Sequence, residues 1–153
     1  GTWYFMNDKG VMFNQTWLYQ GSNWYAFKSS GAMISADWLY DNGSWYYLKD
    51  SGSMATGWLK NGGSWYYLED SGSMATGWLK DSGTWYYLKD SGSMATGWVK
   101  DSGSWYYLKN SGSMATGWVK DSGKWYYLAS SGNMLSNTRT PDGYYVDASG
   151  AWK

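Results

Sequence analysis

The chain has 153 residues, of which 22% are aromatic, with 14 Trp, 16 Tyr and 21 Gly, and its formal net charge is zero. A neutral chain argues against a nucleic-acid partner, because phosphate binding needs a basic surface, and its many aromatic residues argue against intrinsic disorder. The sequence contains no Cys and no His, which excludes thiol and Ser–His nucleophiles and removes the commonest zinc ligands.

The N-terminal stretch GTWYF has the sequence of the middle of a repeat. We therefore expect residues 1–15 to be the back half of a repeat unit, and the chain to be a piece of a longer protein. Neither a signal peptide nor an apolar run of membrane-spanning length is visible.

A sequence motif of about twenty residues recurs through the rest of the chain. The copy at 77–96 reads GWLKDSGTWYYLKDSGSMAT. Alignment on WYY predicts whole repeats at 16–36, 37–56, 57–76, 77–96, 97–116 and 117–136. Residues 137–153 are predicted to form a degenerate C-terminal cap, in which Trp152 stands where the repeats carry Met.

Each repeat is predicted to be a β-hairpin followed by a connector. The segments 78–80 and 85–88 are rich in residues that suit strands, and Asp81-Ser82-Gly83 between them supplies the positive-φ positions of a tight turn. A lone hairpin is marginally stable in water, so the units must stack on one another. We therefore predict an all-β fold, a β-solenoid of stacked hairpins with about 20 residues per repeat and no helix.

The register of these hairpins is left open by the sequence. A two-residue turn is expected to place Trp78 opposite Trp85 on one face. A three-residue loop with a bulge is instead expected to place Trp78 opposite Tyr86.

Two tryptophans recur in each repeat, seven positions apart, on either side of the turn. Packing accounts for the leucines, for one tyrosine of each Tyr-Tyr pair and for the methionines. Trp, however, is bulky and rarely fully buried, so its repeated use predicts exposed indole faces that bind a ligand. Sugars stack on such faces, and quaternary ammonium groups are held by aromatic cages. The polar residues beside the Trp pairs are explained as turn residues, which favours the cage.

The pattern (T)GW-x6-WYY-x4-G-x-M, repeated across residues 1–153, resembles the choline-binding repeats of pneumococcal-type surface proteins, autolysins and phage lysins. The resemblance implies a left-handed superhelix of hairpins that anchors a parent protein to the surface of a Gram-positive cell wall. The implied partners are the choline and phosphocholine of wall teichoic and lipoteichoic acids, with no nucleic acid and no membrane insertion. A homodimer through the C-terminal end is a further expectation.

The resemblance also implies the site residues, because in that family each site forms between neighbouring repeats. The GW tryptophan and the WYY tryptophan supply two walls, the first Tyr of the following WYY supplies the third, and Met or Leu lines the bottom. No complete site is expected at Trp3 and Tyr25, which no GW tryptophan precedes. The implied choline-binding sets are Trp17, Trp24 and Tyr46; Trp38, Trp45 and Tyr66; Trp58, Trp65 and Tyr86; Trp78, Trp85 and Tyr106; Trp98, Trp105 and Tyr126; and Trp118, Trp125 and Tyr144.

No catalytic residues, metal site or cofactor are expected in this chain. Its carboxylates, such as Asp70, Asp81 and Asp101, fall at repeated turn positions rather than as a pair in a cleft. Any wall-hydrolase activity would belong to a domain outside these residues.

Two other functions remain open at this point. A glucan-binding repeat shares the aromatic hairpin of about twenty residues, and free choline would not elute it from a choline-like support. A spacer or dimerisation module would carry vestigial sites and show no spectral change with choline.

Overall fold

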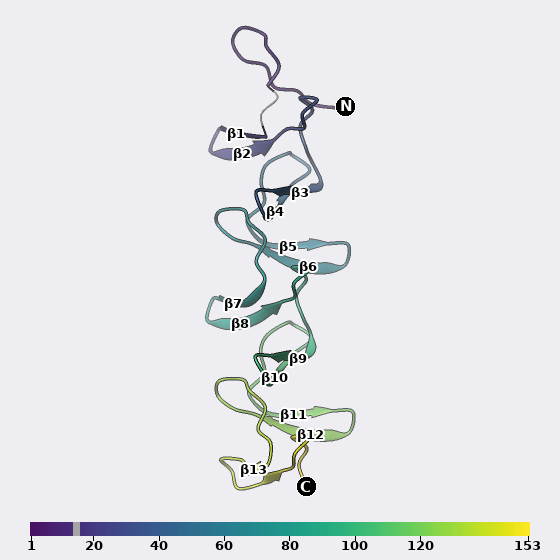
Figure 1. Cartoon of the computed structure of the whole chain (residues 1–153), viewed down its shortest axis with the longest axis vertical. Helices are drawn as coiled ribbons and strands as arrows, with labels where there is room; N and C mark the ends of the chain where they lie inside the picture. The colour runs from purple at the N-terminus through teal and green to yellow at the C-terminus, as the bar shows by residue number, and fades with distance from the viewer. Residues whose placement is uncertain (14–15) are drawn as a thin grey trace. The chain divides into compact units, whose positions relative to one another are not determined.

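The computed structural model describes residues 1–13 and 16–153, and its regular elements there are short antiparallel strands paired into two-stranded hairpins (Figure 1). No helix occurs among these described residues. The predicted all-β fold of repeated hairpins is thus confirmed. The predicted boundary between residues 1–15 and the repeat 16–36 falls at residues 14–15, outside the described part.

The chain divides into two compact units, Gly1–Ala75 and Thr76–Lys153. The first unit contains three hairpins, built from β1 (Trp17–Gln20) and β2 (Asn23–Ala26), β3 (Asp37–Asp41) and β4 (Ser44–Leu48), and β5 (Gly57–Asn61) and β6 (Ser64–Leu68). The second unit contains the hairpins of β7 (Gly77–Asp81) and β8 (Thr84–Leu88), β9 (Gly97–Asp101) and β10 (Ser104–Leu108), β11 (Gly117–Asp121) and β12 (Lys124–Leu128), and β13 (Thr138–Arg139) and β14 (Tyr145–Val146).

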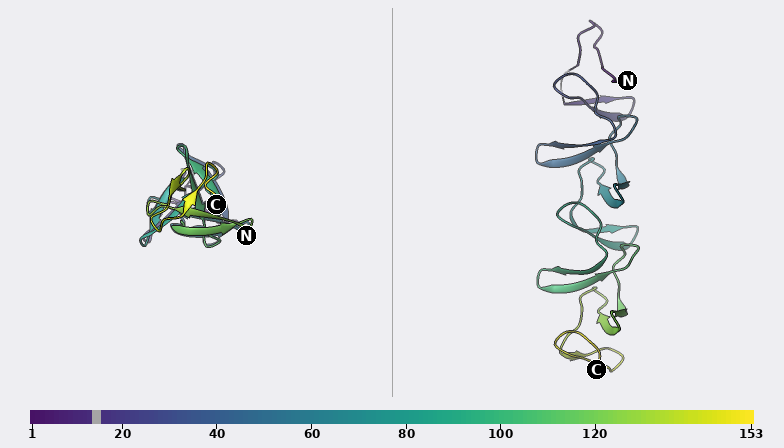
Figure 2. Two further views of the ribbon diagram at one scale, coloured as in Figure 1. Left: turned by 90° about the horizontal axis from the view of Figure 1, so that it is seen from below. Right: turned by 90° about the vertical axis from the view of Figure 1, so that its right-hand side faces the viewer.

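Each predicted repeat contains one hairpin, and the cap contains the short pair β13–β14. Within the second unit, successive hairpins point in different directions about a common centre (Figure 2). This arrangement within the unit is the stacking expected of a β-solenoid. The left-handed sense of the superhelix stays a prediction.

The turn has two residues in each of the six full repeats, so the two-residue alternative had the correct loop length, but neither alternative named the correct residue opposite Trp78. Asp81 pairs with Thr84, so only Ser82 and Gly83 lie in the loop. Their φ angles are 49° and 81°, the positive values that a type I′ turn requires at both central positions. Asp81 therefore extends the strand instead of opening the loop, and Trp78 lies opposite Tyr87.

A narrow core runs through the connectors. Leu88 and Leu108 end their hairpins with no exposed surface, and each forms a β-bridge with the Met six residues later. Three other full repeats have an equally buried leucine, and the first has Phe27 at this position, 5% exposed: the leucines are Leu48, Leu68 and Leu128. One buried leucine per repeat cannot fill a globular core, so each hairpin depends on its neighbours for burial.

The connectors also tie consecutive repeats together through backbone and side chain. The amide of Met114 donates to the carbonyl oxygen of Trp85 at 2.8 Å, which links this connector to the preceding hairpin. The side chain of Met94 fills the space above Gly112, where an added Cβ would lie 2.2 Å from the Met sulfur. Gly112 has a φ of 84°, so its lack of a side chain serves both the turn and the packing.

The cap repeats this connector with different residues. Trp152 forms a β-bridge with Val146, as Met134 does with Leu128 in the preceding repeat. Its amide donates to the carbonyl oxygen of Trp125 at 2.8 Å. Trp152 therefore occupies the position of the repeat Met, as the sequence predicts.

Candidate functional site

The register gives each hairpin two faces with different roles. Residues that lie opposite each other in a hairpin share a face, and alternate residues along a strand do too. In β9–β10, Trp98 lies opposite Tyr107 and Lys100 lies opposite Trp105, so these four residues share one face. Tyr106 lies on the other face.

The two tryptophans of a repeat meet diagonally across this shared face. The ring centroids of Trp78 and Trp85 are 6.3 Å apart at an interplanar angle of 88°, and those of Trp98 and Trp105 are 6.4 Å apart at the same angle. Edge-to-face contacts of this kind are favourable for aromatic pairs. The Trp pair therefore forms a corner with two perpendicular walls.

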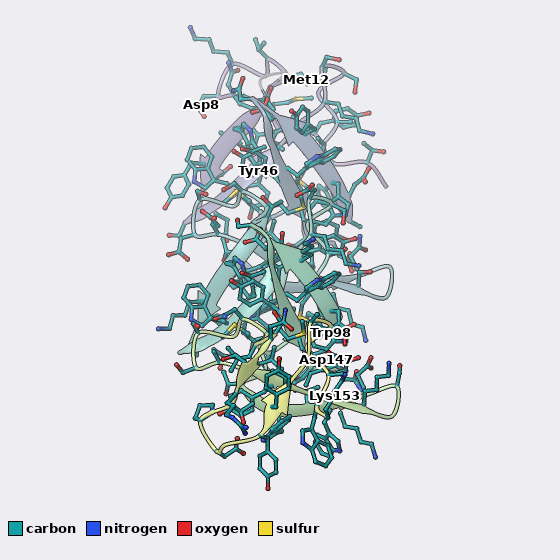
Figure 3. All side chains as sticks on the ribbon, turned by 60° about the horizontal axis from the view of Figure 1, so that its bottom comes forward. Asp8, Met12, Tyr46, Trp98, Asp147 and Lys153 are labelled. Carbon is teal, nitrogen blue, oxygen red and sulfur yellow. The ribbon has the colours of Figure 1, made fainter. Side chains whose placement is uncertain are left out.

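The opposite face of the next hairpin closes this corner. The ring of Tyr106, on β10, lies 4.8 Å from that of Trp78 at 68°. The ring of Tyr126, on β12, lies 5.0 Å from that of Trp98 at 75°. Trp98 is labelled in Figure 3. The hairpins β9–β10 and β11–β12 thus each carry a Trp corner on one face and the third wall of the preceding corner on the other.

The first unit holds two of the expected sets. Trp17 lies 6.5 Å from Trp24 and 5.0 Å from Tyr46, between ring centroids, so this set is brought together. In the second set, the ring of Trp38 lies 5.0 Å from that of Tyr66.

The third expected set divides between the two units. Trp58 and Trp65 lie 6.4 Å apart in the first unit, and Tyr86 belongs to the second. The set as a whole therefore stays a prediction.

The WYY tryptophans keep much of their surface in solvent. Trp85 is 39% exposed and Trp105 42%, whereas the leucines that follow them are completely buried. A cavity of about 340 Å³ is lined by Trp98, Trp105, Tyr126, Met134 and Ser149. The exposed indoles therefore border open, ligand-sized space instead of packing into the core.

The last expected set is also brought together, with an additional wall from the cap. A cavity of about 370 Å³ is lined by Trp118, Trp125, Asp142, Tyr144 and Trp152. The ring of Tyr144 lies 5.9 Å from that of Trp118 and 6.0 Å from that of Trp152. Sequence reasoning placed Trp152 in a Met position but did not assign it to a site.

Carboxylates take part in these sites, which sequence reasoning missed. The indole nitrogen of Trp98 donates to Asp121 Oδ2 at 3.3 Å, from the strand end of the next hairpin. Trp118 donates in the same way to Asp142 Oδ2 at 2.8 Å. The interpretation of these acids as solvated turn residues was incomplete, because the indole N–H needs a partner when it is partly buried. Their spacing of 23 or 24 residues from the tryptophan was the available signal.

The Asp142 carboxylate is held in its charged form. A hydrogen bond from the Thr140 hydroxyl, followed by that from the Trp118 indole, lowers the pKa of Asp142. Donors to a carboxylate favour its ionised state. A negative charge therefore stands at the rim of the last aromatic site.

Lysines lie beside the other wall of four sites. The ammonium nitrogen of Lys80 lies 5.6 Å from the ring centroid of Trp85, its cross-strand neighbour. In β1–β2 the equivalent neighbour of Trp24 is Tyr19, at 5.1 Å between ring centroids. The other three such lysines are Lys60 on Trp65, Lys100 on Trp105 and Lys120 on Trp125, at 5.8–5.9 Å.

Residues 1–13 and 16–153 contain no group of three or more Asp, Glu, His or Cys side chains arranged to hold a metal ion. They also contain no helix long and apolar enough to cross a membrane. The arrangement consists of electron-rich ring faces with separated charges beside them.

Comparisons with known proteins agree with this repeat architecture. A family model described as a choline-binding repeat matches residues 40–76, 62–96 and 95–138. A second model, described as a putative cell wall binding repeat, matches residues 1–12 and 15–33. None of the curated protein sequences compared with the chain matches it significantly.

Three solved structures illustrate the similarity. Choline binding protein F from Streptococcus pneumoniae, solved with a peptidoglycan analogue, is 44% identical with a TM-score of 0.88, over 100% of this chain and 55% of that one. CbpJ from Streptococcus pneumoniae TIGR4 is 40% identical with a TM-score of 0.75, over 98% and 61%. The modular autolysin LytC from Streptococcus pneumoniae is 31% identical with a TM-score of 0.74, over 98% and 40%. The chain thus spans about half the length of these relatives.

Proposed function

Because this chain belongs to the choline-binding repeat family, we propose that it is a non-catalytic module that attaches a parent protein to the bacterial cell wall by binding choline. Its ligands are the choline groups of wall teichoic and lipoteichoic acids, held in the aromatic corners. Its location is extracellular and associated with the cell wall, in line with both family descriptions.

The single observation that carries this proposal is the corner of three rings. Trp98, Trp105 and Tyr126, from two consecutive hairpins, line one cavity. A trimethylammonium group is attracted to such faces by their quadrupoles, and it needs no hydrogen-bond acceptor. Sugar binding requires several directed hydrogen bonds in addition to ring stacking, whereas the walls of this corner are aromatic rings.

The affinity of one corner is low. A cation–π contact is worth about 0.5–1 kcal/mol when exposed and about 2 kcal/mol when desolvated, so three rings give on the order of 2–5 kcal/mol. This corresponds to millimolar binding at best. A polymer with repeated choline groups engages several corners at once, which raises the overall affinity by a factor of about 10² to 10⁴.

The module has no catalytic role in this proposal. LytC is an autolysin of which this chain covers 40%, and any hydrolase activity of the present protein would belong to a domain outside residues 1–153.

A homodimer through the C-terminal end stays a prediction, which sedimentation velocity tests directly.

A titration of tryptophan fluorescence with choline tests the proposal. We expect a saturable change in the millimolar range, and elution from a diethylaminoethyl support by free choline. Elution by glucan oligosaccharides instead would favour the carbohydrate-binding alternative. The absence of any choline-dependent change would refute the proposal and favour a spacer with vestigial sites.

A further inference from the structure

A second cavity lies beside the last aromatic site and has a different chemistry. Its volume is about 470 Å³, and three of the residues that line it are lysines with exposed side chains, namely Lys120, Lys124 and Lys153. We call it the lysine cavity. Trp125 and Trp152 line both cavities, whereas the other residues of the last aromatic site line that site alone.

We propose that the lysine cavity binds an anion of the phosphate class, independently of the choline sites. Several ammonium groups around one cavity attract a group that carries more than one negative charge. Lysine suits phosphate because its compact ammonium acts as a point charge, whereas the paired recognition of a carboxylate favours arginine. The lining residues include no arginine. The positive charge is confined to one cavity, so it suits a single phosphate group and gives no basic track for a nucleic acid.

Lys124 departs from the pattern of the repeats. It pairs with Asp121 at the first strand position after the two-residue turn. Asp121 already accepts hydrogen bonds from the Trp98 indole and the Ser122 hydroxyl, both at 3.3 Å, so it does not depend on a lysine as its partner. The hairpin does not require one either, because the other full repeats carry an uncharged residue at this position: Asn23, Ser44, Ser64, Thr84 and Ser104.

Lys153 departs from the pattern in the same cavity. Its amide donates to the carbonyl oxygen of Tyr145 at 3.2 Å, as the amide of Ala115 donates to that of Tyr107 in an earlier repeat. Ala115 is 1% exposed, so this position is apolar and buried in that repeat, whereas the lysine of the cap is exposed. Two separate departures from the repeat, at Lys124 and Lys153, therefore place positive charge around one cavity.

The acidic side chain that lines the cavity is engaged by its own turn. Asp147 Oδ1 accepts hydrogen bonds from the amide and the hydroxyl of Ser149, at 2.8 and 2.6 Å, and from the amide of Ala151 at 3.2 Å. The Ser149 hydroxyl above all, together with these amides and the charge of Lys153, lowers the pKa of Asp147. Figure 3 labels Asp147 and Lys153. The carboxylate offsets part of the positive charge, but three ammonium groups line the cavity with it.

An NMR titration of the full chain with inorganic phosphate tests this inference. At low salt, we expect saturable amide shifts at Gly123, Lys124 and Ser149 that a sodium chloride series of the same ionic strength does not produce. The variant K124Q/K153Q should bind phosphate about two- to tenfold more weakly, the combined range of two exposed ion pairs. Lys120 is kept, because its ammonium also lies 5.8 Å from the ring centroid of Trp125.

The control K89Q/K109Q removes two exposed lysines from connector turns and changes the net charge equally. It should bind phosphate as the wild-type chain does. An equal loss of phosphate affinity in the two variants would overturn the inference, because only the net charge of the chain would then matter.

A second probe distinguishes the sources of the phosphate group. Poly(glycerol phosphate) without choline presents phosphodiesters of a polymer, whereas inorganic phosphate is the free ion. Saturable shifts at the cavity with the polymer would assign the site to a polymer phosphate, and shifts with inorganic phosphate alone would assign it to the free ion. Both results support an anion site, and the absence of saturable shifts with either probe would overturn it.

Competition with choline separates this inference from the proposed function. Neither Lys124 nor Lys153 lines an aromatic site, so K124Q/K153Q should keep its affinity for choline, and saturating choline should leave the phosphate affinity unchanged. Displacement of phosphate by choline would overturn the inference of an independent site. A chain that binds choline but not phosphate would refute this inference alone, and one that binds phosphate but not choline would refute only the proposed function.

Discussion

The indole nitrogen of Trp78 donates a hydrogen bond to Asp101, which lies at the end of β9 in the next hairpin, at 3.3 Å. The same Trp78 ring contacts Tyr106 of that hairpin. The hydrogen bond between Trp78 and Asp101, which joins one repeat to the next, therefore also positions the Trp78 wall of the candidate site. Folding of the stack builds the site in advance, so ligand binding does not have to order it.

Replacement of an exposed wall should remove binding without unfolding the chain. Trp105 is 42% exposed, so Trp105→Ala should cost little stability but leave its corner with two rings. We expect the number of choline groups bound at saturation to fall by one in calorimetry, with an unchanged unfolding midpoint. Trp3→Ala is the matched control, because Trp3 is 73% exposed and lies outside the expected sets. Unaltered stoichiometry in the Trp105 variant would contradict this assignment.

The acids beside the rings should contribute through their charge. In D101N/D121N an amide oxygen can still accept the indole hydrogen bonds, but the negative charges are lost. Because the charges are near the surface, we expect choline affinity to fall by about two- to threefold in fluorescence titrations. The control D50N/D90N changes two exposed connector acids and should leave the affinity unchanged. A loss of the same size in both variants would mean that only net charge matters.

Substitution of the connector glycine Gly112 should destabilise the chain more than substitution of the turn glycine Gly103. Gly103 and Gly112 have φ angles of 82° and 84°, so Ala at either position carries the same backbone strain, roughly 1–2 kcal/mol. Only at Gly112 would the new Cβ meet the Met94 side chain, at 2.2 Å from its sulfur. Chemical denaturation should therefore show a larger loss of unfolding free energy for Gly112→Ala. Equal losses would show that Met94 moves aside freely.

Much of this architecture follows from sequence because it is repeated. The strand-turn-strand pattern of 77–96 predicts a hairpin, and its recurrence predicts stacking, which the structure bears out. Tyr106 and Tyr126 contact the rings of Trp78 and Trp98, where the family resemblance implies a third wall, and their part in choline binding stays a prediction.

The register could not be obtained in the same way. Asp81-Ser82-Gly83 admits more than one loop, and the choice depends on which residues adopt positive φ, which composition alone does not fix. The partners of the indole N–H groups were missed for a related reason. Asp121 lies 23 residues from Trp98, and only the stacking of whole repeats brings the two side chains together.

Choline binding should be nearly independent of pH between 5 and 8. The ligand has no titratable proton at its ammonium, and the chain has no His. The hydrogen bonds of Asp142 from Thr140 and Trp118 lower its pKa in the folded state. Because the pKa of Asp142 is lower in the folded state, its ionised carboxylate stabilises the fold fully at pH values above the pKa of the unfolded chain, near 4. This stabilisation is lost only as the pH falls through the folded-state pKa.

Fluorescence titrations with choline at pH 5, 6, 7 and 8 check this expectation, with circular dichroism at each pH to verify that the hairpins remain folded. We expect dissociation constants that agree within about twofold, since neither the rings nor the permanently charged ammonium changes state over this range. A weakening of tenfold or more at pH 5, with the fold intact, would require a titrating group at the corners. Such a result would contradict the cation–π cage as the source of binding.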